Sequence, residues 1–355
     1  MDIKHATAAY ETWLGRQMPL LAADLNLKHR RMAESSFAFL RATFYRWAQL
    51  FPQVCPELAA APQVLAVGDL HLENFGTWRD REGRLAWGIN DFDEACRLAY
   101  PNDLVRLAVS AQLAVEENHL SCDLESSCQA ILDGYKQCLK QGGEPFVLAE
   151  QHSWLRALAL NELRDPVRYW EKLGQWPAVG SALPAEVKRA LGAAMPEPRL
   201  PWRVAHRQAG LGSLGRRRFT ALAQWRGGLI AREAKELAPS AWHWQQPERS
   251  AGKLLYLDIL QKAARVADPF LQLQGLWVLR RLAPDCSRIE MAALPRTKDE
   301  LRLLHAMGRE TANIHVGDRR SRAILADMRK RPANWLYKAA AAMTKATMTD
   351  WEAWR

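Results

Sequence analysis

Apolar residues along this chain form two kinds of pattern: short uninterrupted runs and longer stretches with helical spacing. Runs of strand length occupy residues 64–67 and 85–89. Helical spacing predicts helices over residues 8–14, 37–50, 103–114, 124–139, 145–163, 166–173, 250–266, 298–314 and 334–354. The first two strands are therefore expected among helices.

The second half of the chain adds a strand-rich segment. Residues 217–225 and 229–235 read as strands joined by a glycine-containing hairpin turn, and 276–282 as a further strand. The predicted fold class is thus α+β. A Pro- and Gly-bearing segment at 177–201 is taken as the boundary between two lobes. The expected units are a mostly helical lobe over residues 1–200, a small antiparallel-sheet lobe over 201–285, and C-terminal helices over 286–355 that return to the first lobe.

Composition agrees with a cytoplasmic globular protein. Of the 355 residues, 48% are hydrophobic, enough for a substantial core. No run approaches the roughly 18 apolar residues of a membrane helix, and the first residues lack a signal-peptide pattern. Six cysteines occur without C-x-x-C pairs or zinc spacing, so reduced thiols are expected.

The net charge of +10 raises a separate hypothesis. Basic residues cluster at 28–31, 216–218 and 319–331, and the chain has fifteen tryptophans. Such a balance suits nucleic acid, or any other polyanion, ATP included. A basic nucleic-acid-associated protein is therefore one alternative, although no nucleic-acid-binding motif accompanies the charge.

Acidic and amide side chains follow the two early strands. Asp69 and Asn74 come after the first, and Asp91 and Asp93 after the second. If the strands are adjacent, these oxygens share one edge, and oxygen ligands of this kind suit Mg²⁺ completed by substrate phosphates. A solvated acidic turn is the simpler alternative.

The spacing of these residues matches the catalytic set of protein kinases. It makes Asp69 the candidate base and Asn74 and Asp91 the metal ligands, with Asp93 as a further ligand or a structural acid. With His71 two residues after the base, the loop resembles that of aminoglycoside and choline kinases. In such relatives an acid at the start of the next helix braces the loop, a role that would fall to Asp103.

A glycine-rich loop lies downstream, at residues 209–215, and the hairpin follows it. In kinases a glycine loop covers the nucleotide phosphates and a strand lysine pairs with them. The corresponding candidates are Gly210, Gly212, Ser213, Gly215 and Lys235. Because this loop follows the catalytic loop instead of preceding it, the arrangement implies a circular permutation.

Several segments together resemble a bacterial kinase-like family known as domain of unknown function 2252. They are RMAESSFAFLR (31–41), GDLHLENFG (68–76), NDFDEA (90–95), DLVRLA (103–108), the glycine loop (209–215), AKE with PS (234–240), ADPFL (267–271) and the helix at 307–315. The resemblance implies a circularly permuted, protein-kinase-like bilobal fold, with a helix-rich catalytic lobe and a small antiparallel-sheet lobe that covers the nucleotide. It leaves the acidic partner of Lys235 open among Glu233, Glu236, Glu248 and Asp258.

The expected function is an ATP- and Mg²⁺-dependent phosphotransferase with an unknown acceptor. Adenine would meet the backbone near Leu282 and Ala283, after the last strand. Two alternatives share this fold: a nucleotidyl transferase and an inactive nucleotide-binding regulator.

Overall fold

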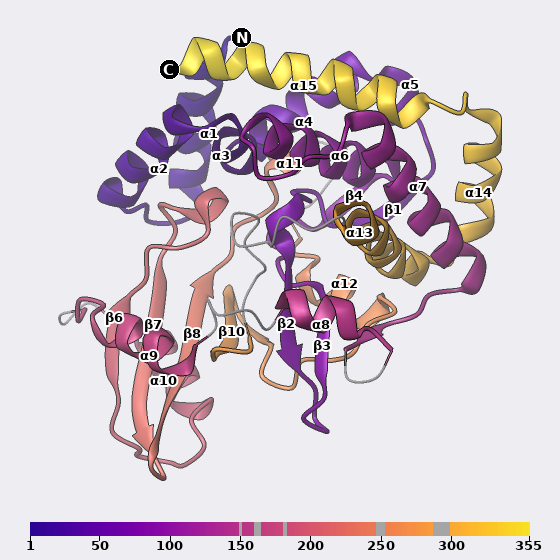
Figure 1. Cartoon of the computed structure of the whole chain (residues 1–355). Coiled ribbons are helices and arrows are strands. Elements are labelled where there is room, and N and C mark those ends of the chain that lie inside the picture. Colours follow the sequence, from indigo (N-terminus) through magenta and orange to yellow (C-terminus); the bar gives the residue numbers. More distant parts are fainter. Residues whose placement is uncertain (149–150, 160–164, 180–182, 246–252, 287–298) are drawn as a thin grey trace.

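The computed structural model describes residues 1–148, 151–159, 165–179, 183–245, 253–286 and 299–355. Helices gather over one half of the molecule and a five-stranded sheet lies in the other (Figure 1). The α+β class is confirmed. The kinase-like permuted arrangement stays a prediction and is considered below.

Five helices open the chain. They are α1 (Ile3–Gln17), α2 (Ala22–Glu34), α3 (Ser36–Ala42), α4 (Phe44–Val54) and α5 (Pro56–Ala59). The single helix predicted over 37–50 is wrong, because Thr43 breaks it into α3 and α4. The Thr43 backbone is not helical, and its hydroxyl donates to the carbonyl of Phe39 at 2.7 Å.

Two small antiparallel sheets follow. Strand β1 (Gln63–Ala66) pairs with β4 (Cys96–Ala99), and β3 (Leu85–Ile89) lies between β2 (Phe75–Arg79) and β5 (Phe146–Val147). The expectation that 64–67 and 85–89 are neighbouring strands is therefore wrong. Asp91 is instead brought near Asn74 by the β2–β3 hairpin, in which the Asn90 amide donates to the Asn74 carbonyl at 2.9 Å.

The main core lies among long helices. These are α6 (Pro101–Glu116), α7 (Leu124–Gln141), α13 (Glu300–His315), α14 (Ser321–Lys330) and α15 (Trp335–Trp354). Helices α7 and α13 cross at Gly134 and Gly308, where a Cβ on either glycine would meet a backbone carbonyl of the other helix. The C-terminal helices thus pack into the first helical layer.

The second half of the chain builds a five-stranded sheet in the order β6-β7-β8-β10-β9. Its strands are β6 (Arg203–His206), β7 (Arg218–Trp225), β8 (Gly228–Glu236), β9 (Gln272–Gln274) and β10 (Trp277–Leu282). The β7–β8 turn contains Arg226 and Gly227, both with positive φ. Short helices α8 (Ser153–Ala159), α11 (Ala241–Gln245) and α12 (Tyr256–Lys262) connect the parts.

Two helices before the sheet pack on its opposite faces. Helix α10 (Ala185–Ala193) shares an apolar cluster with Phe219 and Ala234, and α9 (Pro166–Gly174) shares another with Leu222 and Ala231. Residues 166–193, which the predicted boundary assigns to the first lobe, therefore pack on the sheet.

Three other predicted elements need correction. The segment 145–163 is not one continuous helix, because residues 146–147 form a strand that pairs with β3, and α8 accounts for the helix in the described part of this segment. The helix predicted over 250–266 is shorter, because the chain turns extended at Ala263 and the next amide donates to the Asn313 carbonyl; residues 250–252 lie outside the described part. The segment 177–201, taken as a break, contains α10.

In the described part of the chain, no helix is both long and apolar enough to cross a membrane.

Candidate functional site

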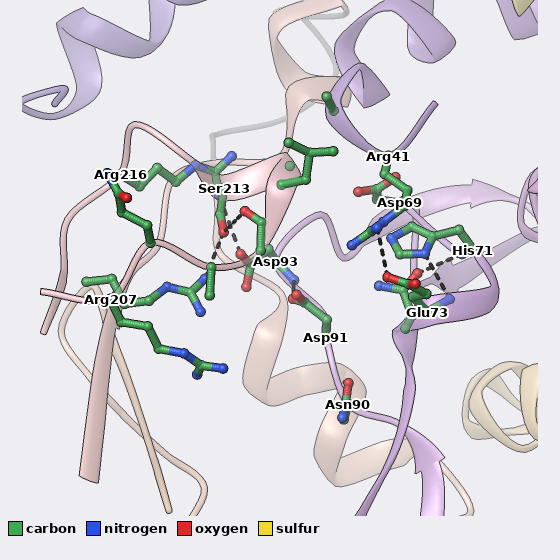
Figure 2. Close-up of a pocket in the computed structure, with 18 of the residues that line it drawn as sticks. Arg41, Asp69, His71, Glu73, Asn90, Asp91, Asp93, Arg207, Ser213 and Arg216 are labelled. Atoms are coloured by element: carbon green, nitrogen blue, oxygen red, sulfur yellow. Dashed lines mark hydrogen bonds and ion pairs between the residues drawn. The ribbon is translucent and has the colours of Figure 1, made fainter. Parts of the chain in front are cut away.

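A cavity of about 700 Å³ separates the helical half from the five-stranded sheet. Its charged lining residues are Lys28, Arg31, Arg41, Arg168, Lys172, Arg207, Arg216, Arg218 and Arg280, against Glu34, Asp69, Glu73, Asp91, Asp93 and Glu94. Figure 2 shows Asp91 and Asp93 between Asp69 on one side and Arg207 and Ser213 on the other. Because basic side chains outnumber acidic ones, the lining suits an anionic ligand.

The loop that carries Asp69 is held in place through its backbone amides. Gly68 has a φ of +84°, and a Cβ there would run into the backbone carbonyl of Glu94. The amides of Val67 and Gly68 donate to the Asp103 carboxylate at 2.7 and 3.0 Å. Asp103, at the start of α6, thus fixes the direction in which Asp69 leaves β1.

Asp103 is itself tied to the C-terminal half of the chain. His315, the last residue of α13, is 3.1 Å from its carboxylate through Nε2, and the other ring nitrogen lies 2.7 Å from the hydroxyl of Tyr135. All three side chains are buried. This network orients Asp103 without reaching the cavity lining.

The Asp69 carboxylate faces the cavity and is bound from behind by Arg106, whose Nε donates at 2.9 Å. Arg106 is fully buried beneath the rings of Phe44 and Trp47. Burial raises the pKa of Asp69 to about 7, although the guanidinium opposes this rise. A carboxylate with such a pKa is suited to accept a proton near neutral pH.

His71 and Asn74 close a short helical turn after Asp69. The Asn74 side-chain oxygen accepts from the His71 amide at 2.6 Å, and the His71 ring accepts from the Glu73 amide at 3.2 Å. Glu73 is ion-paired with Arg41 at 2.7 Å. Both side chains line the cavity. His71 shapes the loop, and Asn74 has one lone pair of its oxygen already used.

Asp91 and Asp93 meet the ammonium group of Lys235, which lies 3.1 Å from Asp91 and 2.6 Å from Asp93. Burial alone would raise the pKa of Asp91, but the ammonium holds it below its usual range. Burial and the neighbouring Asp91 raise the pKa of Asp93 to about 6. Lys235 thus supplies the charge compensation that the sequence pattern suggested for a metal ion.

The acids left open from the sequence as a partner of Lys235 have other partners where the structure describes them. Glu233 and Glu236 bind arginines, and Asp258 pairs with Lys253. Glu248 lies outside the described residues. Because Lys235 is buried behind its two aspartates, it does not line the cavity.

The glycine loop reaches across to Asp69. Gly210, Gly212 and Ser213 line the cavity, whereas Gly215 packs against Leu25 of α2. A Cβ on Gly212 would lie 2.9 Å from the carbonyl oxygen of Arg41 and 3.3 Å from Asp69 Oδ2. The Ser213 hydroxyl accepts from Arg218 at 2.8 Å. The loop therefore forms one wall beside the candidate base.

We expect Gly212→Ala to displace this loop, because the added methyl would press on a backbone carbonyl that cannot rotate away. The free energy of unfolding should fall by about 1–3 kcal/mol, as for other overpacked sites. Urea unfolding measures the change. Gly228→Ala, where a Cβ would meet nothing within 4 Å, is the matched control. Equal stabilities for the two variants would contradict the close approach.

Arginines around Glu233 are the residues that the sequence analysis missed. Fully buried Glu233 lies 2.7 Å from Arg207, 3.4 Å from Arg218 and 2.6 Å from Arg280. Arg207 and Arg280 keep about a quarter of their side chains exposed and line the cavity. Side chains alternate between the two faces of β8, so Glu233 lies on the same face as Lys235. This alternation was the sequence signal that could have pointed to Glu233 as part of the site.

Arg216 is the second missed group. Its guanidinium lies 3.0 Å from Glu94 and 3.7 Å from Asp93, and it is buried. Like Arg218 and Lys28, it belongs to the basic clusters noted in the sequence, yet all three side chains are buried and line the cavity. They form no basic outer surface for a nucleic acid.

The oxygen atoms of the site show whether its residues could hold a metal ion. No group of three or more His, Cys, Asp or Glu side chains placed to hold a metal occurs among the residues that the structure describes. Asp91 nevertheless keeps 35% of its side chain exposed on the cavity, near Asn74. One carboxylate and one amide oxygen fit a hard cation that is completed by water and phosphate.

Comparison with known proteins gives one match. Neither the curated proteins nor the solved structures that were compared contain a match to the chain. The sequence model of a family described as "Uncharacterized protein conserved in bacteria (DUF2252)" matches residues 20–167. The motifs up to residue 108 fall within the match, and those from the glycine loop onward lie beyond it. The match supports the resemblance noted above for the first part of the chain, which carries Asp69, Asn74 and Asp91.

Proposed function

We propose that this protein is a kinase-like phosphotransferase that uses ATP and Mg²⁺. One observation carries the proposal: Lys235, from the sheet, is ion-paired with Asp91 and Asp93, which follow the β2–β3 hairpin of the other half. This contact joins two segments that the sequence assigned separately to metal and phosphate binding. It borders a cavity with an excess of basic lining residues.

Each group has a chemical role in the proposed reaction. Asp69 accepts the proton of the acceptor hydroxyl, and its raised pKa suits that step. The backbone around Gly210 and Gly212 lies against the phosphates. Arg207 and Arg280 neutralise phosphate charge, since both keep about a quarter of the side chain exposed on the cavity, whereas Lys235 is buried. Positioning and charge neutralisation supply most of the rate.

Asn74 and Asp91 would hold the Mg²⁺ ion. The ion would neutralise phosphate charge and orient the transferred group. Asp93, with a Lys235 contact and an Arg216 contact, serves as a structural acid in this proposal.

The kinase-like reading also draws support from the order of the parts. The Asp69 loop precedes β2 and β3, and the glycine loop precedes the β7–β8 hairpin with Lys235. Leu282, Pro284 and Cys286 line the cavity after β10, where the sequence analysis expected the adenine. This order is the one that a circularly permuted kinase would have.

Thermal unfolding with ATP tests the proposal. We expect ATP to stabilise the wild-type protein by about 2.7 kcal/mol at a hundredfold excess over Kd, and only when Mg²⁺ is present. Asp91→Asn should remove the Mg²⁺ dependence, because it removes the exposed carboxylate. Asp133→Asn, on the exposed face of α7, is the control. Absence of any Mg²⁺-dependent effect of ATP on the wild type would refute the proposal.

The position of a radioactive label in ATP distinguishes phosphoryl transfer from nucleotidyl transfer. Incubation with a cell extract should move label from γ-labelled ATP to an acceptor. Transfer of label from the α-position instead would identify a nucleotidyl transferase.

A further inference from the structure

Lys28 is a buried cation for which the proposed chemistry gives no role. Its side chain projects from α2 into the cavity that also exposes Asp69, yet Lys28 is only 2% exposed. Burial lowers its pKa to about 8, so it remains largely charged at neutral pH. A buried ammonium is costly unless something compensates it.

Among the residues that the structure describes, no carboxylate is left to neutralise Lys28. The acids close enough to raise its pKa are Glu11, Glu94 and Asp69. Each is engaged elsewhere: Glu11 with His29 at 2.7 Å, Glu94 with Arg216, and Asp69 with Arg106. Within the described residues, the ammonium makes no hydrogen bond or ion pair and lies 5.6 Å from the centre of the Tyr45 ring.

The position of Lys28 is fixed by its neighbours on α2. One turn earlier, Asp24 accepts from Gln208 at 2.7 Å, and Leu25 packs on Gly215 at the end of the glycine loop. The Tyr45 ring beneath Lys28 stacks on Tyr10, with 4.4 Å between ring centres. Lys28 therefore belongs to the α2 wall of the cavity, whereas Arg280 comes from β10 and Arg207 follows β6.

We propose that Lys28 binds an anionic group of the acceptor, so that the substrate is a hydroxyl compound carrying a carboxylate or a phosphate. The inference rests on the proposed phosphotransferase function, because it takes Asp69 as the base for the acceptor hydroxyl. An anion at Lys28 supplies the missing counter-charge while its hydroxyl reaches Asp69. A neutral acceptor would leave the ammonium uncompensated.

Inorganic phosphate serves as the probe for this subsite. Calorimetric titration should detect phosphate binding to the full chain, and Lys28→Gln should weaken it roughly tenfold to a hundredfold, the range for a lost hydrogen bond to a charged group. Lys28→Arg should retain part of the affinity. Lys172→Gln removes an equal charge from the α9 wall of the same cavity and should change little. Equal losses in Lys28→Gln and Lys172→Gln, or no binding to the wild type, would overturn the inference.

The anion that binds Lys28 could belong to the acceptor or could be the γ-phosphate of ATP. Phosphate binding in the presence of nucleotides distinguishes these two cases. Phosphate should bind in the presence of either Mg·ADP or a non-hydrolysable Mg·ATP analogue. Exclusion by the ATP analogue alone would place the γ-phosphate at Lys28 and overturn the acceptor role. If instead no Mg·nucleotide stabilises the wild type while phosphate binding still requires Lys28, the phosphotransferase proposal fails, and the acceptor role with it. The anion site itself would fail by a different result, namely a phosphate affinity that does not depend on Lys28.

Discussion

Asp69→Asn should reduce phosphoryl transfer by about 10²–10⁴-fold, the usual contribution of a general base. Asparagine keeps the size of the side chain and can still contact Arg106, but it cannot accept the proton of the attacking hydroxyl. The rate of ADP release from Mg·ATP, with water as the acceptor, measures the loss. Binding of a Mg·ATP analogue should be unchanged, since the proposal places Asp69 against the acceptor and not against the nucleotide.

The pH dependence gives an independent test of the same role. With a pKa of about 7, Asp69 is mostly protonated in more acidic solution and cannot act as a base. We therefore expect kcat/KM of the wild type to rise with pH up to about 7 and then to level off, and the residual activity of Asp69→Asn to lack this step. A wild-type profile that is flat between pH 5 and 8 would rule out Asp69 as the titrating base.

Glu233→Gln should destabilise the folded protein by about 3–5 kcal/mol, the cost of leaving buried charges without a partner. The fully buried carboxylate is shared by Arg207, Arg218 and Arg280, which would then repel one another. Guanidinium chloride unfolding measures the change. Glu197→Gln is the control, because its pair with Arg226 is exposed and should contribute less than about 1 kcal/mol.

Acidification should lower the stability of the wild type more than that of Glu233→Gln. Burial opposes ionisation of Glu233, but Arg280, Arg207 and Arg218 hold its pKa well below the usual range. Its stabilising effect is therefore present above the normal glutamate pKa and is lost only as pH falls through the depressed value. The stability gap between wild type and Glu233→Gln should persist at pH 5 and narrow in more acidic solution. A gap of less than about 1 kcal/mol at neutral pH would show that the arginines do not depend on this acid.

Much of the architecture was predictable from local patterns. The β7–β8 hairpin follows from a strand pattern interrupted by Arg226, Gly227 and Gly228, and α6 and α7 follow from regular apolar spacing. The acidic residues after β1 and β3 stood out because two linked motifs carry them, which turn geometry alone does not explain. These signals involve residues close together in the sequence.

Contacts between distant segments were not predictable in the same way. The arginine set around Glu233 depends on strand register, which places Arg280 opposite Glu233 and Arg218 opposite Lys235. With many arginines in the chain, composition could not select these. Local apolar spacing placed residues 146–147 in a helix. Their pairing with β3 is a contact between distant segments, which local spacing does not reveal. Lys28 was part of a basic cluster considered for binding a polyanion, and its burial depends on the packing of α2 against the glycine loop, which the sequence pattern does not reveal.

The link between His315 and Asp103 has a consequence for how the protein is made. The two residues are 212 positions apart, and Asp103 holds the backbone that carries Asp69. During synthesis on the ribosome, the Asp69 loop therefore lacks its complete support until α13 has emerged. A truncated product covering only residues 20–167 would contain the motifs up to residue 108 but neither His315 nor Lys235. We expect such a fragment to expose unfinished apolar surface and to require chaperones to stay in solution.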